Sequence, residues 1–231
     1  MLIAGLQKLT LLDFPGKTAC TVFTPGCNFR CPFCHNALLV TDIDGGTFLD
    51  EEEFFSFLNK RKGILEGVAI TGGEPTLQRE LPLFIKRIKD LGFLVKLDTN
   101  GTNPEMLGTL IEEGLVDRVA MDVKNDPSLY GETAGLKNFD ITGVARSRDL
   151  LLEGRCDYEF RTTVVKGLHT KESLQGAARW IEGAKEYYLQ QYKDSGNLID
   201  PRGLGAFGEA EMKELLEAVR EIIPGAKLRG L

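Results

Sequence analysis

The chain has 231 residues, enough for one sizeable hydrophobic core, and because no change in composition marks a boundary we expect a single domain over residues 1–231. Hydrophobic residues at 42% and charged residues at 27% exclude a disordered chain, a collagen and a disulfide-rich scaffold. A formal net charge of -6 argues against nucleic acid as a general partner, because neutralising phosphates requires a surplus of lysine and arginine.

Short apolar segments alternate along the chain with longer amphipathic stretches, as in the βα units that build a parallel sheet. Strands are predicted at 19–23, 67–70, 93–97, 118–121, 158–165 and 187–191. Helices are predicted at 50–60, 81–91, 104–113, 145–153, 171–182 and 209–223. The first helix begins at Asp50, with Glu53 at the spacing of a capping box. Two further stretches, 125–143 and 195–208, are predicted to be irregular.

Successive βα units of this kind are consistent with an open doubly wound sheet or with part of a (β/α) barrel. Both architectures place chemistry just beyond the carboxyl ends of the parallel strands. No segment approaches the ~20 apolar residues that span a bilayer, and residues 1–12 lack the features of a signal peptide. An odd number of cysteines at low density is typical of reduced thiols, so the sequence predicts a cytoplasmic protein without membrane association.

Three cysteines follow the first predicted strand at the spacing C-x3-C-x2-C, namely Cys27, Cys31 and Cys34. A closed zinc site needs four ligands, usually in two knuckles, and no second knuckle is present. An ordinary iron-sulfur cubane also takes four cysteines, and the remaining candidates, Cys20 and Cys156, are interpreted as buried apolar thiols. Three thiolates leave one coordination position open, as in a metal centre that binds its substrate. A zinc site or a chance spacing is the alternative interpretation.

The pattern C-x3-C-x-aromatic-C, with Phe33 as the aromatic residue, resembles the signature of the radical SAM enzymes. In that superfamily three cysteines hold a 4Fe-4S cluster whose fourth iron binds S-adenosylmethionine (SAM). One electron from the cluster then cleaves SAM into methionine and a 5'-deoxyadenosyl radical. The resemblance therefore implies one cluster on Cys27, Cys31 and Cys34, which act in catalysis through it, with Phe33 and His35 beside the cofactor.

The second predicted strand runs into the sequence TGGEP. Glycines there let the backbone approach a ligand closely, and Glu74 offers a carboxylate to an ammonium group; a plain turn between strand and helix is the alternative. The segment resembles the glycine-glycine-glutamate motif of radical SAM enzymes, which holds the amino group of the methionine moiety. The resemblance implies that Gly72, Gly73 and Glu74 bind the cofactor.

The third predicted strand runs into DTNG and the fourth into DVK. Each has an ordinary interpretation, a turn or a cap of the next helix, but together they bring two carboxylates and an ammonium group to one rim. Both resemble segments of the activating enzymes of glycyl radical enzymes. That resemblance implies that Asp122 and Lys124 contact SAM, and that Asp98, Thr99 and Met121 can line a site for a monovalent cation, with Asp98 among the cofactor-binding residues.

Arg161, on the fifth predicted strand, matches an arginine that faces the site in those enzymes; a surface arginine or an ion-paired arginine is the alternative. Lys193 stands where the pyruvate formate-lyase activating enzyme has a ligand-contacting histidine, so this contact is left open. The resemblance extends from Leu12 to about Leu228. Within the group, the stretches 189–192 and 197–201 look most like anaerobic ribonucleoside-triphosphate reductase activating proteins.

The resemblance implies a radical SAM domain built as a partial (β/α)6 barrel of parallel strands. It implies an oxidoreductase that removes a hydrogen atom from a glycine of a partner glycyl radical enzyme, anaerobic ribonucleotide reductase or a similar protein. No cysteines remain for a second cluster, so an external flavodoxin or ferredoxin is expected as electron donor. One alternative is a radical SAM enzyme acting on a small molecule or nucleoside. The other is a non-enzymatic iron-sulfur carrier, which would complete its cage with Cys20 or Cys156.

Overall fold

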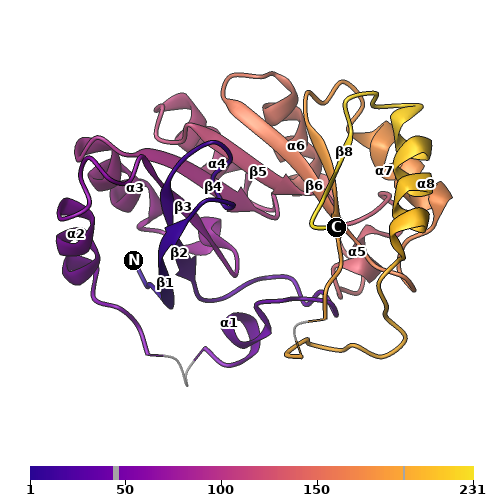
Figure 1. Ribbon diagram of the computed structural model, residues 1–231, viewed down its shortest axis with the longest axis horizontal. Helices are drawn as coiled ribbons and strands as arrows, with labels where there is room; N and C mark the ends of the chain where they lie inside the picture. Colours follow the sequence, from indigo (N-terminus) through magenta and orange to yellow (C-terminus); the bar gives the residue numbers. More distant parts are fainter. Residues whose placement is uncertain (44–46, 195) are drawn as a thin grey trace.

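The computed structural model describes residues 1–43, 47–194 and 196–231, and its strands form one sheet in the order β1 to β8 (Figure 1). Neighbouring strands from β2 to β8 are parallel, and β1 is antiparallel to β2. The predicted α/β class and partial parallel barrel are confirmed. The strands are β1 Gly5–Thr10, β2 Ala19–Thr24, β3 Gly67–Gly72, β4 Leu94–Thr99, β5 Arg118–Asp122, β6 Asp157–Val164, β7 Tyr187–Gln191 and β8 Lys227–Arg229.

The longer helices lie around the outside of the curved sheet (Figure 1). Within the three described ranges, every helix is too short or too polar to cross a lipid bilayer. The helices are α1 Ala37–Thr41, α2 Glu51–Asn59, α3 Leu81–Asp90, α4 Pro104–Glu112, α5 Tyr130–Thr133, α6 Thr142–Leu152, α7 Lys171–Trp180 and α8 Glu209–Arg220, with a 3-10 turn, η1, at Pro75–Leu77.

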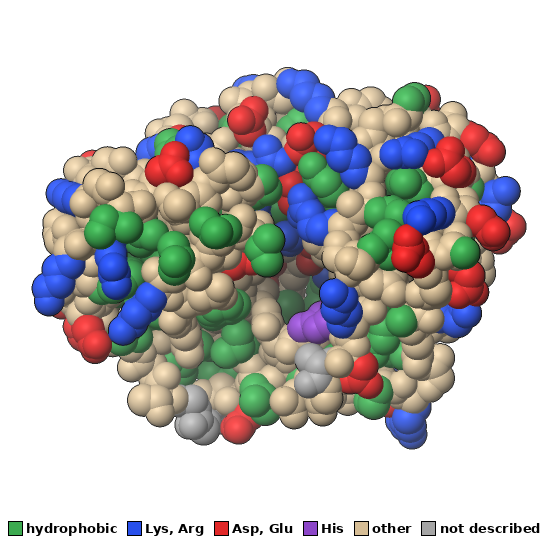
Figure 2. All heavy atoms as spheres, in the orientation of Figure 1, with side chains coloured by type: hydrophobic (Ala, Val, Ile, Leu, Met, Phe, Trp, Pro, Cys, Tyr) green, Lys and Arg blue, Asp and Glu red, His purple; other side chains and the backbone are tan. Residues whose placement is uncertain are grey.

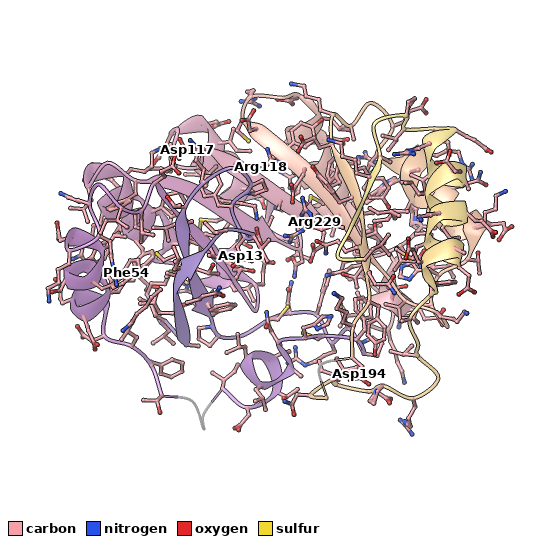
Figure 3. All side chains as sticks on the ribbon, in the orientation of Figure 1. Asp13, Phe54, Asp117, Arg118, Asp194 and Arg229 are labelled. Carbon is pink, nitrogen blue, oxygen red and sulfur yellow. The ribbon has the colours of Figure 1, made fainter. Side chains whose placement is uncertain are left out.

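Helix α2 shows how local sequence sets these elements. The Asp50 side chain caps the helix by accepting hydrogen bonds from the backbone N–H groups of Glu52 and Glu53, as predicted. The return bond that would complete a capping box at Glu53 is absent from the hydrogen bonds of the described residues. The buried face of α2 packs on α3 through Phe54 and Phe84, whose rings stack with centroids 5.2 Å apart (Figure 3 labels Phe54).

The predicted strands and long helices are all present, but several smaller elements, η1 among them, were not predicted from the sequence. β1 and β8 extend the sheet at its two edges, and α1 and α5 lie in loops. β1 lacks an apolar run, and its residues 7–9 are exposed. It is antiparallel to β2 because only a short connection joins the two strands, whereas a parallel pair needs a longer crossover connection. α5 lies within the stretch 125–143 that was expected to be irregular, and Ser195 lies outside the described residues.

The concave interior of the sheet carries charge. Glu159 of β6 is fully buried and accepts hydrogen bonds from Arg229 of β8, at 2.7 Å, and from Arg118 of β5, at 2.8 Å (Figure 3 labels both arginines). Burial by itself would raise the pKa of Glu159, but the two guanidinium groups hold it at about 2. These ion pairs link β5, β6 and β8 through the interior, while apolar side chains of the same strands, such as Val119 and Phe160, belong to the hydrophobic core.

Candidate active site

One cavity opens at the carboxyl ends of the parallel strands. Figure 2 shows a hollow at the centre of the visible face, with Lys, Arg and His side chains at its edge. Every residue predicted from the motifs to act in catalysis or to bind the cofactor lines the cavity. These residues are Cys27, Cys31, Phe33, Cys34, His35, Gly72, Gly73, Glu74, Asp98, Asp122 and Lys124.

The cysteine loop directly follows β2. Its thiols are free, with Cys31 buried and Cys27 and Cys34 partly buried, and the N–H of Cys34 donates to the carbonyl of Cys31 at 3.0 Å. Burial raises the pKa of Cys31 to about 11, and the positive charge of Lys124 opposes part of that rise. In the described part of the chain, no three His, Cys, Asp or Glu side chains converge on one ion position. The three thiols line a shared cavity instead.

The glycines after β3 allow two loops to pack against each other. A Cβ on Gly73 would overlap the carbonyl oxygen of Gly26, and Gly72 adopts φ +117°, which side chains disfavour. The N–H of Gly73 donates to the carbonyl of Thr24 at 2.8 Å, and the N–H of Glu74 donates to that of Gly26 at 2.7 Å. The side chain of Asn36 donates to the Gly72 carbonyl at 2.9 Å. The backbone after β3 is therefore fixed directly beside the cysteine loop.

The carboxylate of Glu74 is bound by the chain itself. Its Oε1 accepts from the N–H and the hydroxyl of Thr76, at 3.1 and 2.6 Å, and from the hydroxyl of Thr99, at 2.7 Å. Its Oε2 accepts from the N–H of Asn100 at 2.6 Å. Burial raises the pKa of this carboxyl group, while these donors oppose the rise. Glu74 therefore joins the ends of β3 and β4, a role that the motif did not reveal.

Five charged side chains form a continuous network across β4, β5 and β6. Asp98 pairs with Lys96 and with Arg161, whose Nη1 lies 3.0 Å from Asp98 Oδ2. Asp122 accepts from Arg161 Nη2 at 2.9 Å and from Lys124 Nζ at 2.8 Å. Arg161 is thus both ion-paired and on the cavity wall, so the two interpretations of this residue hold together.

The network keeps its two carboxylates charged despite their burial, although burial lowers the pKa of Lys96. Burial by itself would raise the pKa of both carboxyl groups, but Arg161 and Lys96 lower that of Asp98. Lys124 and Arg161 hold the pKa of Asp122 at about 2. Burial opposes the charge of Lys124, yet Asp122 raises its pKa above the usual value. The network presents charges of both signs to the cavity, since Lys124, Arg161, Asp98 and Asp122 all line it.

Some residues singled out in the sequence lie elsewhere. Cys20 is fully buried and Cys156 is partly buried, and neither is among the residues that line the cavity. Met121 is fully buried, and its side chain lies against the position where a Cβ on Gly101 would be. Lys193 is exposed and lines a neighbouring pocket, so the structure does not bring it to this cavity.

Several residues in or beside the site were not predicted from the sequence. Lys96 is almost completely buried and belongs to the charged network, and the signal was a lysine between the apolar residues of a buried strand. Asn100 lines the cavity and contacts the cysteine loop, but within DTNG it was interpreted as part of a turn. Polar residues at strand ends were the available signal for both Thr163 and Gln190, which also line the cavity.

Comparison with known proteins identifies the family. Residues 21–138 match the family described as the radical SAM superfamily. A protein of Methanocaldococcus jannaschii, provisionally named a glycyl-radical enzyme activating enzyme, is 31% identical over 99% of this chain and 95% of its own length. The chain belongs to the radical SAM superfamily. Membership makes it a radical SAM enzyme and implies a 4Fe-4S cluster and SAM as cofactors.

Other radical SAM relatives differ in what they are named for. A protein of Sulfolobus acidocaldarius, provisionally named GTP 3',8-cyclase, is 37% identical over 79% of this chain, which spans 56% of that protein. Among solved structures, Streptococcus suis SuiB bound to its precursor peptide SuiA superposes with a TM-score of 0.72. It is 14% identical, and the match covers 91% of this chain and 48% of SuiB. At that identity the likeness concerns the fold alone.

Proposed function

We propose that this radical SAM enzyme activates a glycyl radical enzyme, anaerobic ribonucleotide reductase or a similar protein, by removing a hydrogen atom from one of its glycines. The likeness to the M. jannaschii protein carries the proposal, because it extends over 99% of this chain and 95% of the relative. The match is therefore not confined to the segment that carries the cysteine motif. The cluster and SAM together supply the 5'-deoxyadenosyl radical that this chemistry needs.

The thiols of Cys27, Cys31 and Cys34 would hold the cluster. They fit such a group because they share one cavity, are unpaired with one another and lie near the ammonium of Lys124, whose charge favours the thiolate form. Cys20 and Cys156 are not on the cavity wall, so the protein offers three thiols there and leaves a position for SAM. Phe33 and His35 lie on the same wall and would contact the cofactor.

The charged network would bind the amino acid part of SAM. Lys124 and Arg161 are the cations of the network that line the cavity, and they would donate to the SAM carboxylate. Asp98 and Asp122 could accept from the SAM ammonium, and backbone carbonyls at Gly72 and Gly73 are available on the same wall. Because four donors of the chain already bind Glu74, we propose that it orients these loops rather than carrying the ammonium alone.

A flavodoxin or ferredoxin would supply the electron, since the remaining cysteines, Cys20 and Cys156, do not share a site. The cation site implied by the resemblance would use Asp98 and Thr99, both on the cavity wall, with Met121 contributing only its backbone because its side chain is buried toward Gly101. Uptake of a monovalent cation can be tested separately from the radical chemistry.

The test is electron paramagnetic resonance of a reconstituted mixture. Enzyme loaded with iron and sulfide is incubated without oxygen with reductant, SAM and a glycyl radical enzyme from the same organism. We expect the doublet of a glycyl radical on the partner and one 5'-deoxyadenosine for each radical formed. The variant Cys31→Ala is the matched control and should give neither signal. Absence of a doublet with every glycyl radical enzyme of that organism would contradict the proposal.

A second function is favoured by the similarity to the S. acidocaldarius cyclase, which is 37% identical to this chain. In that case the enzyme would act on a small molecule or nucleotide. Formation of 5'-deoxyadenosine with a nucleotide and SAM, in the absence of any partner protein, would support this alternative. In that case, 5'-deoxyadenosine formed with SAM and the partner protein, but without a nucleotide, would remain at background.

A further inference from the structure

The side-chain amide of Asn100 has a fixed orientation at the end of β4. Its Oδ1 accepts hydrogen bonds from the N–H of Thr102, at 3.0 Å, and from the hydroxyl of Thr102, at 2.7 Å. A backbone N–H can only donate, so the amide oxygen must be on this side. The NH2 group of Asn100 therefore points in the opposite direction, toward the cysteine loop.

The NH2 group of Asn100 has two acceptors in that loop. Nδ2 lies 2.8 Å from the Oδ1 of Asn28 and 3.8 Å from the Sγ of Cys27. The amide of Asn28 in turn donates to the hydroxyl of Thr102 at 2.8 Å, which closes a ring of hydrogen bonds through Asn28, Thr102 and Asn100. Because the ring fixes Asn28 and Asn100 relative to each other, one N–H of Asn100 remains directed at Cys27.

The groups that hold Asn100 in this position are buried. Asn100 is 5% exposed, and its backbone N–H donates to the carboxylate of Glu74, which is 1% exposed. The hydroxyl of Thr99 donates to the same carboxylate. Glu74 thus holds the turn that carries Asn100, and this turn holds the loop that carries Cys27. The sulfur also accepts from the N–H of Phe29 at 3.3 Å, so among the described residues Cys27 has two donors, of which Asn100 is the side chain.

We propose that Asn100 is a positioning residue whose N–H···S hydrogen bond orients Cys27 and raises the reduction potential of the cluster that this cysteine holds. The inference rests on the proposed function only in that Cys27 must be a cluster ligand. One electron from an added reductant increases the negative charge on the cluster and its sulfurs. A donor aimed at one sulfur stabilises that added charge, and hydrogen bonds to the sulfurs are among the factors that set such potentials.

The test is a redox titration of the loaded protein without SAM, followed by the electron paramagnetic resonance signal of the reduced cluster. Asn100→Ala removes the donor without changing charge, and we expect a more negative midpoint potential than in the wild type. At a fixed poise the reduced-to-oxidised ratio should fall several-fold; tenfold would be about 59 mV for a one-electron couple.

Asn103 provides the matched control on the same loop. It caps α4 by accepting from the N–H of Met106 and donates to the carbonyl of Thr76, without a hydrogen bond to a cysteine among the described residues. Asn103→Ala should therefore leave the midpoint potential unchanged. Unchanged potentials in loaded Asn100→Ala protein would overturn the inference.

A second pair of variants covers a failure of Asn100→Ala to take up the cluster. Asn100→Asp keeps an acceptor for Thr102 but loses the donor, and Asn103→Asp adds the same charge three positions away. A larger negative shift in Asn100→Asp than in Asn103→Asp supports the inference, and equal shifts contradict it. If both Asn100 variants fail to take up the cluster while both Asn103 variants take it up, the result supports the positioning of Cys27 by Asn100. A wild-type protein that takes up no cluster would instead overturn the proposed function.

Discussion

Cys27, Cys31 and Cys34 differ from Cys20 and Cys156 in the surface they share, since only the first three line the cavity. Burial raises the pKa of all five thiols, to about 12 for Cys20 and about 11 for Cys156. Lys124 favours the thiolate at each of the three cavity cysteines, whereas it is not among the groups that act on the other two. Position on the cavity wall and the nearby charge of Lys124 therefore distinguish the three cysteines suited to bind a cluster from the other two.

We predict that Cys20→Ala and Cys156→Ala keep the full content of iron and acid-labile sulfide after reconstitution, while Ala at Cys27, Cys31 or Cys34 abolishes it. The physical reason is access, because a thiol outside the cavity cannot reach a cluster inside it. Cys20→Ala should lower the free energy of unfolding by about 1 kcal/mol, since it removes a fully buried side-chain atom. Loss of iron in either of these two variants would favour a carrier with a protein-ligated cage.

At the scale of elements, the site depends on close contact between the loops after β2, β3 and β4. Gly73 lies against the carbonyl of Gly26, and Glu74 ties both to the turn after β4. Each of these contacts joins two groups of the chain itself. The backbones of Gly73 and Gly26 can approach this closely because Gly73 has no Cβ.

Gly73→Ala should lower the free energy of unfolding by at least about 2 kcal/mol, because the added methyl group overlaps backbone that cannot move without breaking the hydrogen bond from the N–H of Glu74. Gly108→Ala is the matched control. Gly108 lies inside α4, and a Cβ added there would lie 3.7 Å from Cδ1 of Leu150, an ordinary contact, so the substitution should raise stability by about 0.5–1 kcal/mol.

Urea denaturation of the three proteins measures both changes. Equal stabilities of the two glycine variants would show that the loops after β2 and β3 can separate without cost. Binding of SAM to the loaded proteins, measured by calorimetry, should weaken in Gly73→Ala and remain unchanged in Gly108→Ala.

At the scale of the whole molecule, charge pairs link strands inside the curved sheet. The network of Asp98, Arg161 and Asp122 links β4, β5 and β6 beside the cavity, and Glu159 links Arg118 and Arg229 below it. Such ion pairs add little stability compared with apolar residues of similar volume, but removal of one member leaves a buried charge without its partner. The interior is therefore polar enough to receive a charged ligand and sensitive to single substitutions.

Arg161→Gln should lower the free energy of unfolding by about 3 kcal/mol, the lower end for breaking a buried ion pair because the network borders a cavity. Arg161→Lys, which keeps the charge but not the forked geometry, should recover part of the loss. Urea denaturation at neutral pH checks the order, and equal stability of wild type and Arg161→Gln would contradict it.

The same substitution should change the acid sensitivity. The folded pKa of Asp122 is about 2, below its unfolded value of about 3.9, so its stabilisation is complete above the higher value and is lost as the pH falls toward the lower one. Without Arg161 the folded pKa of Asp122 moves toward its unfolded value, so less stability is lost between the two values and the fall of stability with pH in this range should become shallower. Urea denaturation at about pH 5 and about pH 3, followed by circular dichroism, measures this difference between wild type and Arg161→Gln.

The sequence by itself determined the βα order, the strand positions and the motif residues that face the cavity. The predicted strand at 187–191 coincides with β7, and the motifs at the ends of β2 to β5 all reach one cavity. This was possible because parallel strands necessarily bring their carboxyl ends to one edge, so that residues far apart in the chain become neighbours.

Only the tertiary structure decided what the polar groups of those motifs bind. Glu74 and Asn100 are neighbours through a loop contact between β3 and β4, and Arg161 bridges Asp98 and Asp122 from a third strand. The edge strands β1 and β8 likewise depend on pairing with a sheet that already exists. Whether a hydrogen bond or ion pair forms between distant segments depends on differences of a few tenths of an ångström between donor and acceptor positions. Periodicity and spacing along the chain do not encode such differences.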